Sequence, residues 1–408
     1  MEKLLLLVHR IPYPPNKGDK IRSYHLLRHL CARYQVHLGT FIDDADDWQH
    51  VPRLQGLCAG SHFAALHPLR GRLRSLAALA GGRPLSCDYY RDAGLRRWVD
   101  DTVRREGITR IVCYSSPMAQ YTDAHPSARR VMDFVDVDSD KWRQYAAGKR
   151  WPMRQIYQRE ARLLLDYERD VARSSDASLF VSPPEAQLFR TLAPESAARI
   201  GHYSNGVDTE FFSPANDYAR PDLYPAEARV LAFTGAMDYW PNIDAVSWFA
   251  REALPAIRAA APDVMFCIVG SRPAPAVQRL AELPGVMVTG TVPDVRPYLA
   301  HAALCVAPMR IARGIQNKVL EAMAMARPVL VSPQALEGID AVPGRELLLA
   351  DDAAAFARAA LDHLLTPGPA IGTAARAKVE QLYGWESNLA AVSALLEQRP
   401  AQPWPRSA

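Results

Sequence analysis

The stretch that decides the fold is GIQNKVLEAMAMARPVLV, Gly314–Val331. It predicts a turn, then an amphipathic helix, then a buried strand. The glycine breaks the chain before the helix, and Leu320, Met323 and Ala324 recur at helical spacing. Pro328 ends the helix, so PVLV begins a strand.

Two charged residues, Lys318 and Glu321, lie three positions apart on this helix, so their side chains share neighbouring surface. A helix start preceded by glycine, with a cation close by, can hold an anion such as phosphate. A carboxylate one turn further along can accept two hydrogen bonds from a sugar diol. The segment alone equally favours a surface Lys–Glu pair on a packing helix.

Short apolar runs alternate with helical patterns in two successive series. The first series predicts strands at residues 4–9, 36–41, 62–66, 111–116, 131–136 and 178–182, with helices around 20–33, 72–80, 93–106 and 154–174. The second predicts strands at 230–235, 266–271, 286–290, 304–308, 328–331 and 346–350, with helices at 243–260, 275–282, 294–301, 316–325 and 353–365. Such alternation is typical of an α/β, doubly wound parallel sheet.

The two series are separated by residues 208–228, which are rich in proline, aspartate and aromatic residues, a composition typical of a linker. We therefore predict two Rossmann-like domains, residues 1–205 and 206–384. A chain of 408 residues is long enough for both.

The composition, 49% hydrophobic and 23% charged, is that of an ordinary globular protein. No apolar run approaches the roughly 18 residues of a membrane span. The initial LLLLVH is too short for a signal-peptide core and predicts a buried strand. The six cysteines are scattered without a CxxC pair, which argues for reduced thiols and against a disulfide framework or structural zinc. These features predict a cytoplasmic protein.

Charge is uneven along the chain. Residues 1–210 hold 31 Lys and Arg against 25 Asp and Glu, and the remainder holds 17 against 19. A basic first half suits an anionic partner or a membrane surface, but the excess is too small to indicate nucleic acid, and no nucleic-acid motif is present. LRGRLRSLAALAGGRP (69–84) mixes four arginines with an apolar face. It predicts either peripheral contact with the cytoplasmic face of an inner membrane or packing on the first domain.

Glycines follow three consecutive predicted strands of the second domain: Gly235, Gly270 and Gly290. Open α/β sheets bind ligands beyond the carboxyl ends of their strands, and a missing side chain lets another molecule approach the backbone. One such glycine commonly ends any strand–helix turn, whereas three in succession favour a ligand cleft.

The motifs SNGVDTEFFSP, FTGAMDYWPNIDAV, IVGS, VTGTVPDVRPYLAHA and GIQNKVLEAMAMARPVLVS follow one another over about residues 200–345. In this order they resemble the carboxyl-terminal domain of retaining glycosyltransferase family 4, and PYPPNKGDKIRSYHLLRHL resembles the start of its amino-terminal domain. MDFVDVDSDKWRQYA and NKVLEAMAMA are similar to the branch associated with exosortase (PEP-CTERM) exopolysaccharide systems. The resemblance implies the GT-B architecture, two Rossmann-like domains facing a central cleft, with residues 385–408 crossing back onto the first.

The resemblance also implies a UDP- or GDP-linked sugar donor as substrate, with no cofactor and no metal. Glu321 would accept the ribose hydroxyls, and the turn at Thr291, Val292 and Pro293 would lie beside the base. Gly18 would let its loop close over the diphosphate and sugar. The remaining residues implied in nucleotide-sugar binding are Gly235, Gly270, Gly314 and Lys318.

This sequence departs from the family pattern at three positions. The usual Arg and Lys after the first strand of the second domain are replaced by Ala236 and Pro241, and a usual glutamate by Arg313. A departing diphosphate requires positive charge. We hypothesise that Arg313 and Lys318 supply it, forming with Glu321 the catalytic set. The rival hypothesis is that the site has lost catalysis.

For the acceptor, Lys17, Lys20 and Arg22 beside Gly18 could meet the phosphates of a lipid-linked molecule, or lie solvated on the surface. Asp136 and Asp138 are candidates for an acceptor- or sugar-facing role. Alternatively, Asp133 and Asp136 end a strand while Asp138 or Ser139 caps a helix. His9 favours a structural role over that of a base.

The sequence thus predicts retaining transfer of a sugar from a nucleotide donor to a glycan or polyprenyl-linked acceptor, in exopolysaccharide biosynthesis. One alternative is a nucleotide-sugar 2-epimerase of the same fold. A second is a transferase-like scaffold without activity, which the absent Arg and Lys keep open.

Overall fold

The computed structural model describes residues 1–15, 18–67, 81–312, 314–366 and 371–397. Lys17, Arg313, the predicted helix at 72–80 and most of the basic segment 69–84 therefore lie outside the described residues. The chain forms two compact units: Met1–Ser204 together with the segment that begins at Leu389, and Asn205–Asn388.

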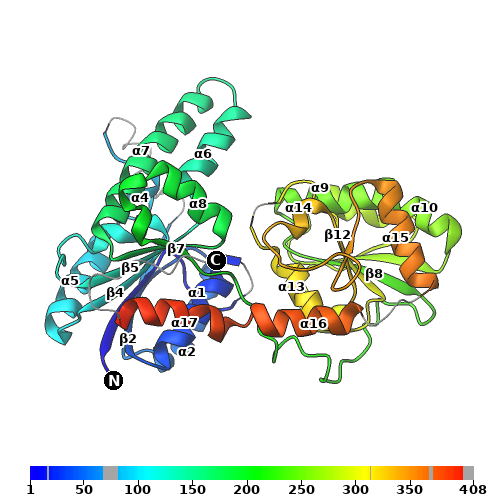
Figure 1. The fold of residues 1–408 in the computed structure, drawn as a ribbon, viewed down its shortest axis with the longest axis horizontal. Coiled ribbons are helices and arrows are strands. Elements are labelled where there is room, and N and C mark those ends of the chain that lie inside the picture. Colours follow the sequence, from blue (N-terminus) through cyan, green and yellow to red (C-terminus); the bar gives the residue numbers. More distant parts are fainter. Residues whose placement is uncertain (16–17, 68–80, 313, 367–370, 398–408) are drawn as a thin grey trace. The chain divides into compact units, whose positions relative to one another are not determined.

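The first unit is built on a seven-stranded parallel sheet in the order β3-β2-β1-β4-β5-β6-β7 (Figure 1). Its strands are β1 (Lys3–Val8), β2 (Gln35–Ile42), β3 (Gly60–Ala65), β4 (Arg110–Tyr114), β5 (Arg129–Val135), β6 (Ala177–Phe180) and β7 (Ile200–His202). In β1 every residue from Leu4 to Val8 is buried, because helices cover both faces of the sheet.

The helices of the first unit are α1 (Gly18–Cys31), α2 (Val51–Leu57), α4 (Leu85–Tyr89), α5 (Ala93–Glu106), α6 (Asp138–Ala147), α7 (Met153–Ser174) and α8 (Pro183–Leu192), with 3-10 turns at Ala45–His50, Ser116–Tyr121 and Pro194–Arg199. Figure 1 shows α6 and α7 as a helical hairpin that projects beyond the sheet.

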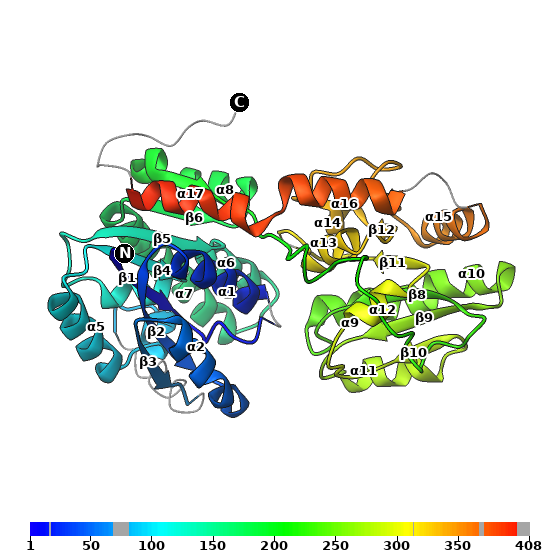
Figure 2. The same cartoon turned by 90° about the horizontal axis from the view of Figure 1, so that it is seen from below.

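Helix α17 (Trp385–Glu397) runs along the first unit (Figure 2). Ser393 Oγ lies 2.8 Å from His29 Nε2 of α1. Arg110 of β4 and Arg129 of β5 donate to the carbonyls of Leu396 and Leu395. These bonds fasten the last turns of α17 to the first sheet.

The second unit is built on a six-stranded parallel sheet in the order β10-β9-β8-β11-β12-β13. Its strands are β8 (Arg229–Thr234), β9 (Val264–Val269), β10 (Val286–Val288), β11 (Leu304–Ala307), β12 (Val329–Val331) and β13 (Leu348–Leu349). Its helices are α9 (Trp240–Trp248), continued by a π-helical turn Phe249–Ala253 and α10 (Leu254–Ala260), then α11 (Pro275–Gln278), α12 (Arg296–Ala300), α13 (Asn317–Ala324), α14 (Pro333–Leu336), α15 (Ala353–Leu365) and α16 (Ile371–Leu382), with a 3-10 turn at Arg279–Glu282.

Each predicted strand corresponds to an observed one, and the doubly wound parallel sheets are confirmed. The sequence reasoning missed β7, which has only three residues, and the helices α2, α4, α8, α14 and α16. Among the described helices, none has the length and apolar character needed to cross a membrane.

Candidate functional site

The candidate site of the second unit lies at the carboxyl edge of its sheet. The chain runs from β8 outward to β9 and β10, then returns to β11 on the other side of β8. Ligands of open α/β sheets bind at such a switch point. Helix α13, which carries Lys318 and Glu321, follows β11 at this point.

Lys318 lies at this edge of the sheet, and its hydrogen-bond partner is a neutral amide. Its Nζ donates to Asn242 Oδ1 at 2.6 Å and lies 4.5 Å from the ring centroid of Phe233. Among the described residues, Lys318 has no direct ion pair with a carboxylate, and Glu321 acts on its charge through space. The ammonium is therefore oriented by a neutral amide and remains available to an anionic ligand.

Asn242, on the first turn of α9, was missed by sequence reasoning. Its side chain is buried, and its Nδ2 donates to the Ala236 carbonyl at 2.9 Å. The amide nitrogen thus binds the loop after β8, and the amide oxygen accepts from Lys318, so Asn242 links that loop to the lysine. The sequence signal was a Pro–Asn pair at a helix start shortly after Gly235.

Lys318 and Glu321 both titrate near neutrality. Burial raises the pKa of Glu321 to about 7, although the neighbouring ammonium lowers it. Burial lowers the pKa of Lys318 to about 8, although Glu321 raises it. Perturbed groups of opposite charge at a switch point mark a candidate functional site.

Gly235 and Gly270 are required by the packing of the protein itself. A Cβ atom at Gly270 would lie 1.6 Å from the Gly235 carbonyl oxygen, and one at Gly235 would lie 2.7 Å from Asn242 Nδ2. The loops after β8 and β9 also share a 2.8 Å bond from Met237 N to the Ser271 carbonyl. The absent side chains are therefore explained without a ligand, and the predicted nucleotide contacts remain predictions.

The other predicted nucleotide contacts follow neighbouring strands. Thr291 is exposed, whereas Val292 packs on a small apolar cluster that includes Tyr224. Gly314, with φ +63°, precedes α13, and its carbonyl accepts a bond from Gln316 Nε2 at 3.1 Å. Arg313 lies outside the described residues, so its catalytic role stays a prediction.

Ala236 and Pro241, where the sequence pattern usually has Arg and Lys, are uncharged. Ala236 supplies the carbonyl that Asn242 binds, and Pro241 lies in the first turn of α9. Two arginines follow other strands: Arg272 pairs with Asp238 at 3.0 Å, and Arg310 Nε donates to Asp244 at 2.9 Å. Each arginine already has a carboxylate partner, unlike Lys318.

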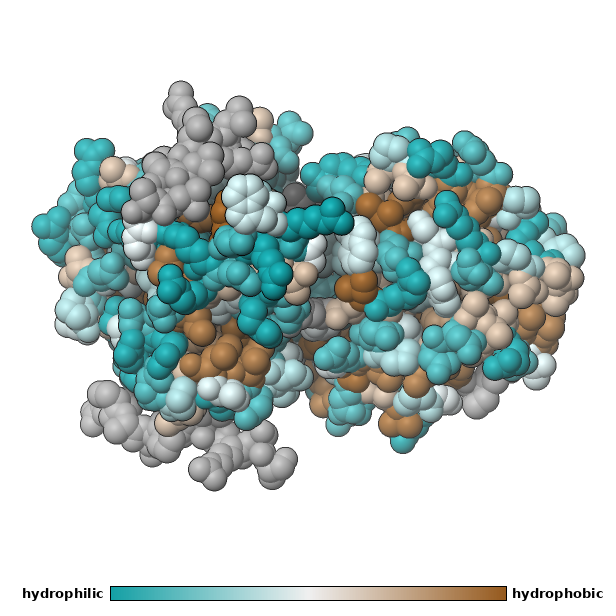
Figure 3. Space-filling view, turned by 90° about the horizontal axis from the view of Figure 1, so that it is seen from above, coloured by the Kyte–Doolittle hydropathy of each residue, from teal (hydrophilic) through white to brown (hydrophobic). Residues whose placement is uncertain are grey.

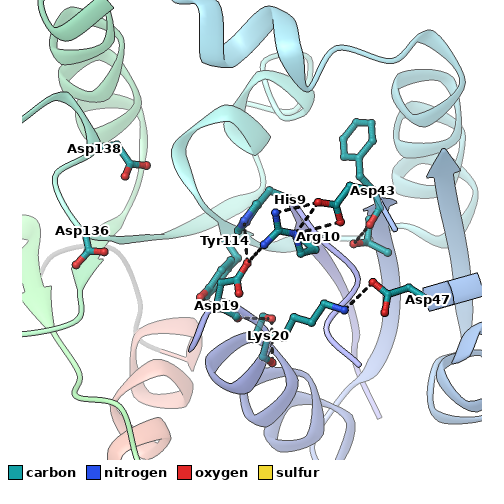
Figure 4. Close-up of polar contacts among 12 residues, drawn as sticks. His9, Arg10, Asp19, Lys20, Asp43, Asp47, Tyr114, Asp136 and Asp138 are labelled. Atoms are coloured by element: carbon teal, nitrogen blue, oxygen red, sulfur yellow. Dashed lines mark hydrogen bonds and ion pairs between the residues drawn. The ribbon is translucent and has the colours of Figure 1, made fainter. Parts of the chain in front are cut away.

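At the carboxyl edge of β1 and β2, the first unit carries a cluster of polar residues (Figure 4). Arg10 pairs with Asp19 at 2.6 Å and with Asp43 at 2.9 Å. His9 stacks on Tyr114, and its Nε2 lies 3.6 Å from Asp19. Burial opposes ionisation of Asp19, but His9 and Arg10 outweigh it and hold its pKa well below the usual range. The cluster orders the start of α1.

The prediction that Lys20 and Arg22 contact acceptor phosphates is wrong. Lys20 is buried, and its Nζ pairs with Asp47 at 2.6 Å. Arg22 is 1% exposed and donates to Asp133 at 2.9 and 3.2 Å. Both cations are enclosed and neutralised, so a ligand phosphate has no access to them.

Gly18, by contrast, is exposed at the start of α1. Apart from its chain neighbours and its own helix, no atom of the described residues lies within 4 Å of a Cβ built there. Asp136 and Asp138 are partly exposed and both accept bonds from Lys141, at 2.7 and 3.2 Å. Figure 4 shows these two aspartates apart from the cluster around Arg10. Their ligand contacts stay predictions.

Several alternatives raised by the sequence concern structure rather than ligands. Helix α6 begins at Asp138, and the residue before it, Val137, makes no side-chain cap. Neither Asp138 nor Ser139 therefore caps the helix.

Within the described ranges, no group of three or more His, Cys, Asp or Glu side chains is arranged to hold a metal ion.

Residues 228–366, most of the second unit, match the family described as glycosyl transferases group 1. No curated protein sequence matches the chain. Among solved structures, the chain is similar to the sucrose-phosphate synthase of Thermosynechococcus elongatus, with a TM-score of 0.69 and 18% identity over 97% of this chain and 98% of the other.

Two further structures are similar over nearly their whole length. A glycosyltransferase from Rickettsia africae gives a TM-score of 0.66 at 13% identity, covering 98% of this chain and 99% of the other. Anabaena HepE in complex with UDP-glucose gives 0.65 at 16% identity, covering 97% and 99%. The chain thus has the GT-B fold, and its residues 228–366 match the glycosyl transferases group 1 family.

Proposed function

We propose that the protein is a retaining glycosyltransferase that moves a sugar from a nucleotide donor to a glycan or polyprenyl-linked acceptor, in exopolysaccharide biosynthesis. The observation that carries this proposal is the Lys318–Asn242 pair beside Glu321, at the switch point of a group 1 domain. Similar structures are described with UDP and UDP-glucose bound, which supports a nucleotide-sugar ligand.

In the proposed site, each residue has one task. Glu321, when ionised, accepts the two ribose hydroxyls of the donor. The Lys318 ammonium stabilises the diphosphate as negative charge develops on the departing oxygen. Asn242 positions that ammonium. Gly18 leaves its backbone open to the donor, since no side chain occupies the space.

Retention requires no protein nucleophile in a front-face reaction. The bond between the sugar and the diphosphate oxygen breaks, and the acceptor oxygen bonds to the anomeric carbon on the same face. The acceptor proton passes to the leaving phosphate oxygen, so charge and atoms balance.

The test is thermal unfolding of the wild type with a panel of nucleoside diphosphates and nucleotide sugars. A ligand at about 100 times its Kd adds about 2.7 kcal/mol to the stability of the folded state. We expect one nucleotide series to stabilise the wild type, and the Glu321→Gln variant far less. Glu282→Gln, an exposed change in the same unit, is the matched control.

Product analysis separates the alternatives. With water as a slow acceptor, the anomer released first, observed by NMR, should keep the donor's configuration, and an inverted anomer would contradict retention. Release of a 2-epimer would favour the epimerase. Failure of every nucleotide to stabilise the protein would favour the scaffold, which the neutral Ala236 and Pro241 keep as a rival.

A further inference from the structure

We propose that the tip of the α6–α7 hairpin, residues 145–154, docks on the surface of an anionic lipid bilayer. This segment comprises the end of α6, the connecting loop and the start of α7. It is separate in sequence from the basic segment 69–84 and from the candidate site of the second unit. The inference does not depend on the proposed transfer reaction.

The tip exposes large apolar side chains. Trp151 is 79% exposed, Tyr145 59% and Met153 42%. Leaving such side chains in water forgoes the stabilisation that burial would give, and a group of them marks an interaction site more often than a single one does. Tryptophan and tyrosine are also the residues enriched at membrane–water interfaces, where the ring is buried and its polar atom stays hydrated.

The charge of the tip has one sign. Between residues 141 and 159 the sequence has six Lys and Arg and no Asp or Glu. Lys149, Arg150 and Arg154 at the tip are exposed, and none forms an ion pair with a described carboxylate. At the base of the hairpin, by contrast, Lys141 and Arg143 pair with aspartates. The uncompensated charge is therefore concentrated at the end that carries the exposed aromatic residues.

The hairpin presents this tip on an ordered support. The rings of Trp142 on α6 and Tyr157 on α7 pack edge to face, with centroids 4.9 Å apart. Nearer the sheet, Ser139 Oγ donates to the buried Glu168 at 2.5 Å. Figure 1 shows the two helices standing out from the sheet, so that the tip points away from the described strands of its unit.

A bilayer fits these observations better than a protein or nucleic acid. Figure 3 is seen from the side toward which the hairpin points in Figure 1, and the hydrophobic residues visible there lie among hydrophilic ones. A large apolar protein interface would require more contiguous surface. Three cations beside aromatic residues match a layer of anionic lipid headgroups. Each Lys or Arg near such a surface increases the affinity for the membrane roughly fivefold.

The test is flotation of the full chain with vesicles of phosphatidylglycerol and phosphatidylcholine, and with phosphatidylcholine alone. We expect binding to the anionic vesicles that weakens at high salt. Replacing Lys149, Arg150 and Arg154 by Gln should weaken it roughly 100-fold. Replacing Tyr145 and Trp151 by Ser should weaken it about tenfold or more, including at high salt.

Matched controls keep the test specific. Arg97, Arg104 and Arg105 are three exposed cations on α5, and Trp48 is an exposed tryptophan beside aspartates. Changing these to Gln and Ser should leave flotation unaltered, and all variants should keep the wild-type unfolding midpoint. Equal binding to neutral vesicles, equal loss in the controls, or no flotation at all would overturn the proposal. Binding of an RNA or DNA oligonucleotide by the tip, without vesicle binding, would do so as well.

Discussion

Lys318 and Asn242, 76 positions apart in the chain, are joined by a 2.6 Å hydrogen bond from Nζ to Oδ1. Because Asn242 Nδ2 is held by the Ala236 carbonyl, the amide oxygen is the atom that faces the ammonium. A neutral partner orients the cation without a direct ion pair, so the ammonium remains available to a ligand.

Asn242→Ala should therefore weaken binding of the nucleotide sugar, roughly tenfold, and lower stability by about 1 kcal/mol, since it removes the hydrogen bond that the buried amide donates to the Ala236 carbonyl, which keeps its bond from Tyr239 N. Calorimetric titration and denaturant unfolding measure the two effects. Asn216→Ala, an exposed change in the same unit, serves as the control. Unchanged affinity in Asn242→Ala would show that Asn242 does not position Lys318 for the ligand.

Affinity for a nucleotide sugar should peak between about pH 7 and pH 8. Below pH 7 Glu321 gains a proton and loses its capacity to accept two hydrogen bonds, while above pH 8 Lys318 loses its charge. The diphosphate of a nucleotide sugar remains ionised throughout. Glu321→Gln should abolish the acid limb and Lys318→Met the alkaline limb. A flat profile in the wild type would contradict these assignments.

Gly270→Ala should destabilise the protein by roughly 3 kcal/mol, because its Cβ would meet the Gly235 carbonyl, which is backbone and cannot turn aside. Gly18→Ala should change stability by less than about 0.5 kcal/mol, since the space around it is open. If Gly18 approaches the donor as proposed, its variant will bind the donor more weakly despite normal stability. Urea unfolding and donor titration distinguish the two glycines.

Arg22→Ala should lower the free energy of unfolding by about 3–5 kcal/mol, because the carboxylate of Asp133 would stay buried without its partner. Arg22→Lys should restore little, as an ammonium cannot reproduce the two-atom contact. Arg28→Ala, exposed on the same helix, is the control. Normal stability in Arg22→Ala with weakened acceptor binding would revive the phosphate-contact prediction.

Stability should fall as pH rises through about 8, in part because of Glu168. Burial, with a contribution from Asp138, raises the pKa of this carboxyl to about 8. The folded state therefore holds the proton more tightly than the unfolded chain, and the stabilisation present at low pH is lost as pH increases. At about 1.4 kcal/mol per tenfold change in proton affinity, the loss could reach about 5 kcal/mol.

Glu168→Gln keeps a partner for Ser139 but cannot ionise, so its unfolding free energy should decline less between pH 5 and pH 9. Denaturant unfolding at a series of pH values gives the comparison. Parallel curves for variant and wild type would show that another group governs the decline.

The order of strands and helices could be predicted because it depends on local hydrophobic spacing. Helix α15 was predicted at its observed bounds, and the run LLLLVH became a strand buried on both faces. Short elements such as β7 escaped because three residues carry too little periodicity to be recognised.

The sequence by itself determined the two α/β units and placed Lys318 and Glu321 at the start of a helix after a strand, since neighbours along the chain decide these features. Only the tertiary structure decided what the charges do. Lys20, Arg22 and Lys318 all carry a positive charge. The first two face buried carboxylates 27 and 111 positions away, whereas Lys318 faces a neutral amide. Solvent exclusion and the nearest opposite charge, both set by folding, determine whether a cation serves the core or a ligand.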